Sequence, residues 1–193
     1  MDLLQLCAQR FDRLCAYQYH FVIGRKGHTI AFDLSFRHSD FHHLVGLHKL
    51  KDAVRFQDGR RAVIMERILQ GRLNLEDAKK SQYYPKMEER MLPLLELEAM
   101  LDDNEIIFRY DKEKNRMSVI EADFLLENTF KEKLIYLFLI KRSGDDTHVC
   151  CSLFPFDGKD YTKGQTKYTL LYKEKRNLRT GEAVVQYDKL SLR

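Results

Sequence analysis

A change of hydrophobic period near Asn104 constrains the fold more than any other feature of the chain. Before this point, outside residues 20–36, apolar residues recur every three or four positions, and after it they alternate along short runs. A period of about 3.6 residues is typical of amphipathic helices, and a period of two is typical of strands. The sequence therefore predicts an α+β fold, with an N-terminal helix and hairpin, a helical middle and a C-terminal antiparallel sheet.

The N-terminal part combines helix and hairpin patterns. Residues 2–18 place apolar side chains at helical spacing, and residues 20–36 alternate around a basic, glycine-containing tip. We expect an amphipathic helix followed by a β-hairpin. Ser39 or Asp40 can then cap a short helix, which Gly46 is expected to end or bend.

The middle of the chain is predicted to be helical in two or three pieces. We expect one domain over residues 1–193, with a helical insertion at about 60–103. Residues 84–101 form its longest helical pattern, and Pro93 is expected to kink it. Residues 81–130 carry 12 acidic and 6 basic side chains, a net charge of −6, so this block would repel a polyanion.

The last third is rich in strand patterns. The predicted strands are Glu105–Tyr110, Met117–Ile120, Leu134–Lys141, Thr147–Phe154, Lys167–Lys175 and Val184–Asp188. Residues 143–146, Ser-Gly-Asp-Asp, predict a hairpin turn between the third and fourth of these. Residues 124–130 are ambiguous.

Cysteine spacing and the apolar runs indicate the cellular compartment in which the protein is expected. The four cysteines form no C-x-x-C pair, which indicates reduced thiols in a cytoplasm. The start of the chain lacks the pattern of a secretory signal. The longest apolar run, residues 134–140, is too short to span a bilayer, so we expect a cytoplasmic protein without a membrane partner.

Residues 39–52 concentrate groups that can move protons at neutral pH. The segment holds His42, His43 and His48 with Lys49 and Lys51. On a continuous helix the last two histidines would lie about 140° apart, so no metal site is expected from this spacing.

The three histidines are assigned different environments by a helical wheel. His48 falls on the apolar side and is expected to be a hydrogen-bonded core histidine. His42 falls on the polar side with Lys49 and is expected to be solvated. His43 lies at the boundary, where a side chain is partly buried and still reachable.

Metal-independent RNA cleavage needs a base for the 2′-hydroxyl, an acid for the 5′-oxygen, and cations for the phosphorane. His43 with Lys49 or Lys51 could supply such groups, together with a serine or tyrosine from the sheet. Near the C-terminus, Ser152 and Tyr161 are candidates for that role. Lys163 and Lys167 are candidate phosphate partners. The alternative for this second region is an aromatic-anchored loop with exposed lysines.

Two blocks resemble a known family. Residues 41–50, FHHLVGLHKL, resemble the F-x-H-L-x-G-L/I-x-K-L block of a phage-associated clade of the barnase–EndoU–colicin–RelE superfamily of nuclease-like domains. Ser152, Phe154, Tyr161 and Gln165 resemble the C-terminal block of the same clade. The order of predicted elements is also similar.

The resemblance implies a small, metal-independent ribonuclease of barnase/RelE-like fold that needs no cofactor. Carried over by position, His43, Ser152, Tyr161 and Gln165 become the catalytic candidates, and Lys49 supports them. RNA is then the expected substrate. The role would be that of a toxin or a phage or mobile-element effector, with an antitoxin or immunity protein as a partner.

Two alternatives remain open. The first is a non-catalytic RNA- or protein-binding module of the same fold. The second is a structural or regulatory protein of a mobile element that uses the acidic helices of residues 81–103 as its interface. The sequence leaves the oligomeric state open.

Overall fold

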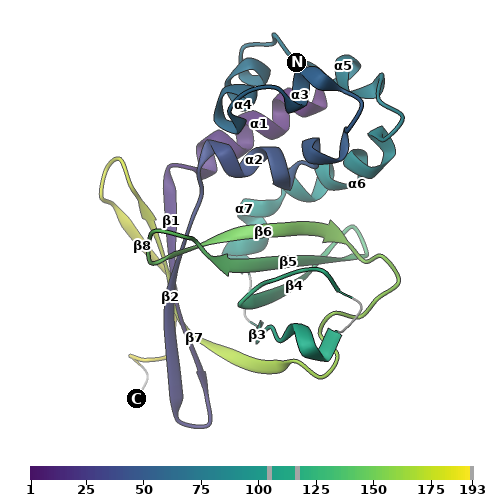
Figure 1. Cartoon of the computed structure of the whole chain (residues 1–193). Helices are drawn as coiled ribbons and strands as arrows, with labels where there is room; N and C mark the ends of the chain where they lie inside the picture. Colours follow the sequence, from purple (N-terminus) through teal and green to yellow (C-terminus); the bar gives the residue numbers. More distant parts are fainter. Residues whose placement is uncertain (104–105, 116–117, 192–193) are drawn as a thin grey trace.

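Seven strands close into a barrel, and a layer of helices covers one end of it (Figure 1). The computed structural model describes residues 1–103, 106–115 and 118–191. The strands are β1 (Tyr17–Arg25), β2 (His28–Ser35), β3 (Ile106–Arg109), β4 (Phe124–Phe130), β5 (Lys133–Lys141), β6 (Thr147–Pro155), β7 (Thr166–Asn177) and β8 (Ala183–Asp188). Their order is β1-β2-β6-β5-β4-β3-β7, β7 pairs back onto β1, and β8 extends β7 outside the ring.

The mixed helix and strand content confirms the α+β prediction, but the prediction of a separate C-terminal antiparallel sheet is wrong. The N-terminal hairpin is part of the barrel, because β1 pairs with β7 from Tyr17 opposite Asn177 to Gly24 opposite Thr169. The pairing of β2 with β6 is parallel. Alternation in a sequence identifies a strand but not its partner, and closure satisfies edge groups that an open sheet would leave unpaired.

The α-helices lie above and behind β6 (Figure 1). They are α1 (Leu3–Leu14), α2 (His38–Leu44), α3 (Val54–Gln57), α4 (Arg61–Leu69), α5 (Leu75–Lys79), α6 (Tyr84–Leu95) and α7 (Leu97–Asp103), with the short 3₁₀ helix η1 (Leu47–Lys49). A second 3₁₀ helix, η2 (Lys112–Asn115), lies beside β3. Asp2 joins two of them, because its carboxylate caps Gln5 N in α1 and accepts from Leu75 N in α5, each at 2.8 Å.

Several predicted boundaries change. The expected helix over residues 84–101 breaks at Glu96 into α6 and α7, and Pro93 lies inside α6. Residues 118–120 form no strand, and the rest of that prediction falls on Met117, outside the described residues. The ambiguous stretch, residues 124–130, is strand β4. The description of residues 60–103 as an insertion stays a prediction, since it concerns other members of a family.

Two hydrophobic clusters lie on opposite faces of the β4–β6 strands. The larger one fills the space between the helices and the barrel interior. The smaller one lies on the outer face, around buried Tyr110, Leu125, Tyr136, Phe138 and Tyr161. Among the described helices, none combines the length and apolar character needed to cross a lipid bilayer.

Candidate active site at the junction of α2 and α6

A sharp turn after α2 brings His43 and His48 together. The helix ends at Leu44, Gly46 takes a left-handed conformation with φ of 89°, and η1 starts at Leu47. The two imidazole rings stack, with centroids 4.1 Å apart and planes inclined by 11°. The prediction that these rings face different ways is therefore wrong, because the helix does not continue through Gly46.

Glycine is required at this turn for two reasons. Its φ of 89° is strained for other residues, and a Cβ there would lie 2.9 Å from Arg90 Cδ and 3.2 Å from Met87 Cα. The backbone of the turn thus lies directly against α6. This close approach brings Arg90, from the acidic part of the chain, beside the two histidines.

His42 has a structural role that the helical wheel did not predict. The residue is only 5% exposed, and its Nε2 bonds the carbonyl oxygen of Phe56 at 2.8 Å. The prediction that His42 is exposed to solvent is wrong. The helical wheel predicts this side of α2 to be exposed, but Phe56 of α3 contacts it. This bond holds α2 and α3 together.

Burial and surrounding positive charge keep both stacked imidazoles uncharged. Burial, followed by the charges of Arg90, Arg61, Lys49 and His42 in that order, lowers the pKa of His43 to about 4. Burial lowers the pKa of His48 to about 3, with His43 the next contributor. At neutral pH both rings are therefore available as proton acceptors.

Cations surround the pair. Burial lowers the pKa of Lys49, and Arg90, Lys86 and Lys51 lower it further. In the described part of the chain, buried His48 Nδ1 and Arg90 Nη1 have no hydrogen-bond partner. We call His43, His48, Lys49 and Arg90 the histidine–arginine cluster. Buried groups without a partner in a positive environment are suited to an anion, which would accept from them.

The cluster reaches the outer face of β6 through Arg90. The guanidinium lies over the ring of Phe154, 5.8 Å from its centroid, and Phe154 packs edge-on against Tyr161 at 5.5 Å. Ser152 lies opposite Phe138 in the β5–β6 ladder and therefore on the same outer face as Phe154. Ser152 and Tyr161 thus lie on the side of β6 to which Arg90 points.

Tyr161 and Gln165 already have partners. The Tyr161 hydroxyl donates to Asp157 Oδ2 at 3.0 Å, and burial followed by this bond raises its pKa to about 12. The Gln165 amide binds both backbone groups of Asp111, at 2.8 and 3.0 Å, and so holds its loop. In the described residues no hydrogen bond or ring contact joins His43 to Ser152, Tyr161 or Gln165, and their catalytic roles stay predictions.

The four lysines predicted to bind phosphate differ in their exposure to solvent. Lys49 is half-buried beside the histidines, whereas Lys51, Lys163 and Lys167 are exposed. Lys51 acts on Lys49 electrostatically, and Lys167 lies on β7 beyond the aromatic cluster. Only Lys49 is therefore a member of the histidine–arginine cluster itself.

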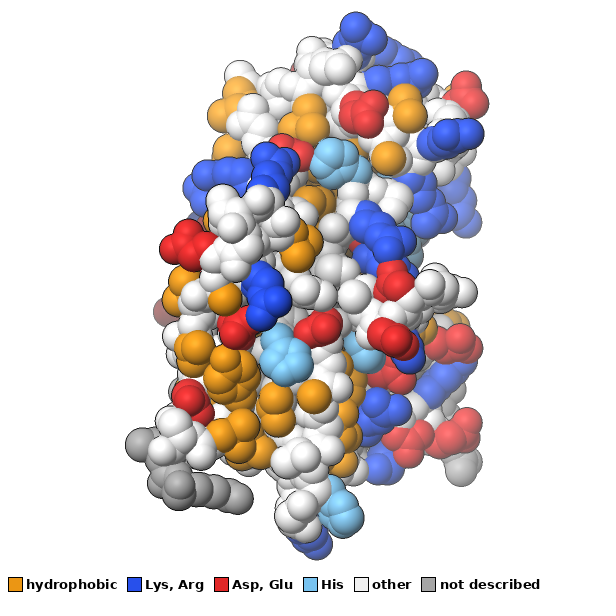
Figure 2. Space-filling view, turned by 90° about the vertical axis from the view of Figure 1, so that its left-hand side faces the viewer, with side chains coloured by type: hydrophobic (Ala, Val, Ile, Leu, Met, Phe, Trp, Pro, Cys, Tyr) orange, Lys and Arg blue, Asp and Glu red, His pale blue; other side chains and the backbone are white. Residues whose placement is uncertain are grey.

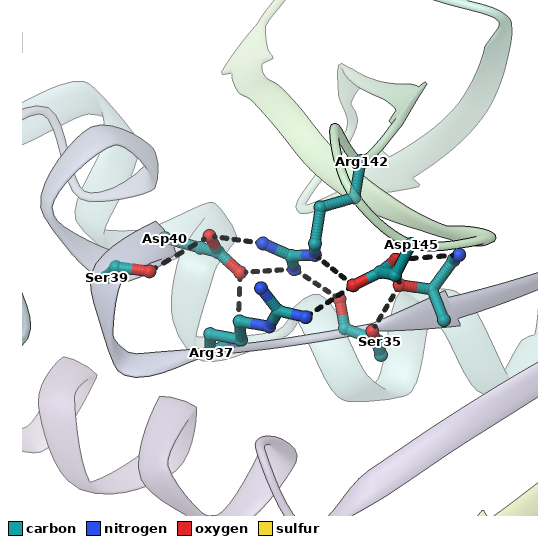
Figure 3. A network of polar contacts seen from close by, with 7 residues as sticks. Ser35, Arg37, Ser39, Asp40, Arg142 and Asp145 are labelled. Atoms are coloured by element: carbon teal, nitrogen blue, oxygen red, sulfur yellow. Dashed lines mark hydrogen bonds and ion pairs between the residues drawn. The ribbon is translucent and has the colours of Figure 1, made fainter.

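A buried ion pair fixes the start of α2 (Figure 3). Arg142, at the end of β5, donates to both carboxylate oxygens of Asp40, at 2.8 and 3.2 Å, and also to Ser35 O at 3.3 Å. Asp40 accepts from Arg37 N at 2.8 Å, and Arg37 pairs with Asp145. The β5–β6 turn therefore holds the helix that carries His43. Neither Arg90 nor Arg142 stood out in the sequence, because each is one of many charged residues.

Other histidines bind carboxylates away from this cluster. His20 hydrogen-bonds Asp33 and His38 hydrogen-bonds Asp12, each at 2.7 Å. Figure 2 shows the face that lies at the left of Figure 1, with histidine beside acidic side chains near the middle of the view and hydrophobic side chains gathered below them. No group of three or more His, Cys, Asp or Glu in the described ranges could hold a metal ion. The expected absence of a metal and of a cofactor stays a prediction.

Replacing Arg142 tests the ion pair. Arg142→Met should lower the free energy of unfolding by about 3 kcal/mol, because it leaves a buried carboxylate without its partner. Arg142→Lys should lower the free energy of unfolding by less, since lysine keeps the charge but not the bidentate geometry. Urea unfolding measures both. If Arg142→Met costs the same in an Asp40→Asn background as in the wild type, the two groups are not coupled.

Stability should fall as the pH is lowered from about 6.5 to 4. In this window the unfolded histidines bind protons while native His43 and His48 do not, so protonation favours the unfolded state. The variant His43→Asn/His48→Asn should show a weaker pH dependence of the urea midpoint. A single His28→Asn change, at an exposed position in the hairpin, is the control. An unchanged pH dependence in the double variant would contradict the burial of these rings.

Comparison with known proteins defines the family. No curated protein and no solved structure matches the chain. A family model described as phage-Barnase-EndoU-ColicinE5/D-RelE like nuclease 4 matches residues 3–190, nearly the whole sequence. The chain thus belongs to this phage-associated family of nuclease-like proteins.

Proposed function

We propose that the protein is a metal-independent endoribonuclease whose acid–base chemistry takes place at the histidine–arginine cluster. The observation that carries the proposal is the stacking of two uncharged imidazoles beside a guanidinium with an unpaired nitrogen. Membership of a nuclease-like family supports the same chemistry.

The two imidazoles provide the proton acceptor and the proton donor. Rings 4.1 Å apart cannot both carry a charge at neutral pH, so the pair holds at most one proton. Binding of an anionic phosphate favours that single proton. The neutral ring then takes the proton of the 2′-hydroxyl, and the charged ring gives its proton to the leaving 5′-oxygen. We assign His43 as the acid, because its pKa is the higher of the two, and His48 as the base.

The bond changes balance without another reactant. The 2′-oxygen forms a bond to phosphorus while the bond from phosphorus to the 5′-oxygen breaks. The products are a 2′,3′-cyclic phosphate and a free 5′-hydroxyl, and the proton moves from one ring to the other. Arg90 and Lys49 stabilise the negative charge that develops on the phosphorane oxygens.

The remaining candidates have supporting roles in this proposal. Ser152 and Tyr161 contact the RNA from the outer face of β6, and Gln165 holds the loop of Tyr161. Exposed Lys51, Lys163 and Lys167 attract the sugar–phosphate backbone. The protein acts in the cytoplasm as a toxin or phage effector, and the acidic helices of residues 81–103 are where an antitoxin or immunity protein binds.

Substitution of the stacked pair tests the proposal. His43→Ala and His48→Ala should each lower RNA cleavage by at least about a hundredfold in EDTA, because each removes one proton-transfer group. The control is His28→Ala, which changes an exposed histidine in the β1–β2 turn. Cleavage is measured on a broad panel of RNAs with the purified protein, and circular dichroism checks the fold.

Two outcomes would contradict the proposal. One is a wild-type protein that cuts no RNA of the panel. The other is full activity of His43→Ala. Salt-sensitive RNA binding that His43→Ala leaves intact, without cleavage by the wild type, would favour a binding module instead.

The pH profile of cleavage should reflect the charges around His43. On the alkaline side, kcat/KM should fall with a midpoint near 4, because His43, the acid, loses its proton in the free enzyme. Arg61→Met removes a neighbouring positive charge, which should raise the pKa of His43 and shift the midpoint to higher pH. Arg67→Met, on the same helix, is the matched control. A midpoint that does not move in Arg61→Met would argue against His43 as the acid.

A further inference from the structure

An apolar groove lies beside the histidine–arginine cluster. It has a volume of about 730 Å³ and runs between α6 and the turn that joins β4 to β5. Its apolar lining includes Leu92, Pro93, Phe130, Leu134, Pro155 and Phe156. Leu92 is 46% exposed and Phe156 is 49% exposed, so the groove presents large apolar side chains to solvent.

A series of aromatic contacts joins this groove to Arg90. The guanidinium lies over Phe154, Phe154 packs against Tyr136 at 6.2 Å, and Tyr136 packs against Phe156 at 6.4 Å. On α6, Glu89 lines the groove and Arg90 belongs to the cluster. Arg90 also lies about one helical turn before Pro93, which lines the groove, so the cluster and the groove share the same part of α6.

Charged side chains of both signs line the groove. Glu88 and Glu89 lie on one side, and Lys131, Glu132 and Lys133 lie at the β4–β5 turn. The carboxylates accept hydrogen bonds from the amino groups of nucleobases, and the lysines attract the phosphates that flank a bound base. Apolar and aromatic side chains bind the faces of bases through stacking, which is how single-stranded RNA is most often recognised.

We propose that the groove binds an unpaired nucleobase of the RNA strand whose phosphate lies at the histidine–arginine cluster. This inference rests on the proposed function and adds that the substrate is single-stranded at the cleavage site. Phe156 and Leu92 hold the base, and the carboxylates select bases that carry amino groups.

Equilibrium binding of a short 2′-O-methyl oligoribonucleotide tests this inference, since that probe lacks the attacking hydroxyl. A second probe of the same length has an abasic residue in place of each base. The wild type should bind the first probe about fivefold to a hundredfold more tightly than the second, as expected for stacking of one or a few bases. The variant Leu92→Ala/Phe156→Ala should abolish most of this difference, because both side chains are lost from the groove.

Two control variants distinguish the loss of base binding in the groove from a general loss of RNA binding. Phe156→Trp should keep the preference, since it retains an aromatic face. Leu178→Ala changes a leucine of similar exposure, 52%, outside the groove and should also keep it. Thermal unfolding checks that the double variant folds, which the exposure of both side chains favours.

The outcomes distinguish this inference from the proposed function. An equal affinity of the wild type for both probes would overturn the proposal that the groove binds a base, even if the protein cuts RNA. An unchanged preference in Leu92→Ala/Phe156→Ala would also overturn it and would leave the groove to a protein partner. A groove-dependent preference in a protein that cuts no RNA would support the base site while the nuclease proposal fails.

Discussion

The close contact between the Gly46 turn and α6 is the constraint on which the candidate site depends. With any side chain at this position the turn could not lie against Arg90 and Met87. Without the turn, η1 would not reverse the chain and His48 would not stack on His43. One backbone conformation therefore brings together three side chains that the sequence separates by up to 47 positions, from His43 to Arg90.

The electrostatics of the site follow from this packing. Histidines that are half-buried among arginine and lysine side chains have pKa values well below that of an ordinary histidine, and so they are uncharged at neutral pH. In the proposed reaction the same cations attract a phosphate, whose charge then compensates theirs. A binding event thereby changes the protonation of the groups that act on the ligand, which is a general way of linking substrate arrival to chemistry.

Local patterns in the sequence predicted the element types well, and tertiary relations poorly. The helices before residue 104, the β5–β6 hairpin and the candidate His43 could all be identified from periodicity, turn residues and a family block. The barrel could not, because the partner of a strand is not encoded in its alternation. The helical wheel misplaced His48, since it assumed a helix that continues past Gly46. It misplaced His42 because a wheel does not show that α3 contacts that side of α2. The sequence did not single out Arg90, because only the packing of α6 against the Gly46 turn places it beside the histidines.

The closure of the barrel has a consequence for how the chain acquires its structure during synthesis. Strand β1 completes its ladder only with β7, so residues near position 20 must wait for residues near position 174 to leave the ribosome. The ion pair that anchors α2 likewise needs Arg142. A partly translated chain thus contains every residue of the histidine–arginine cluster without the scaffold that orders it. Under the proposed function, such a chain would be incomplete as a catalyst until β7 has been synthesised, which would delay damage to the RNA of the cell that makes it.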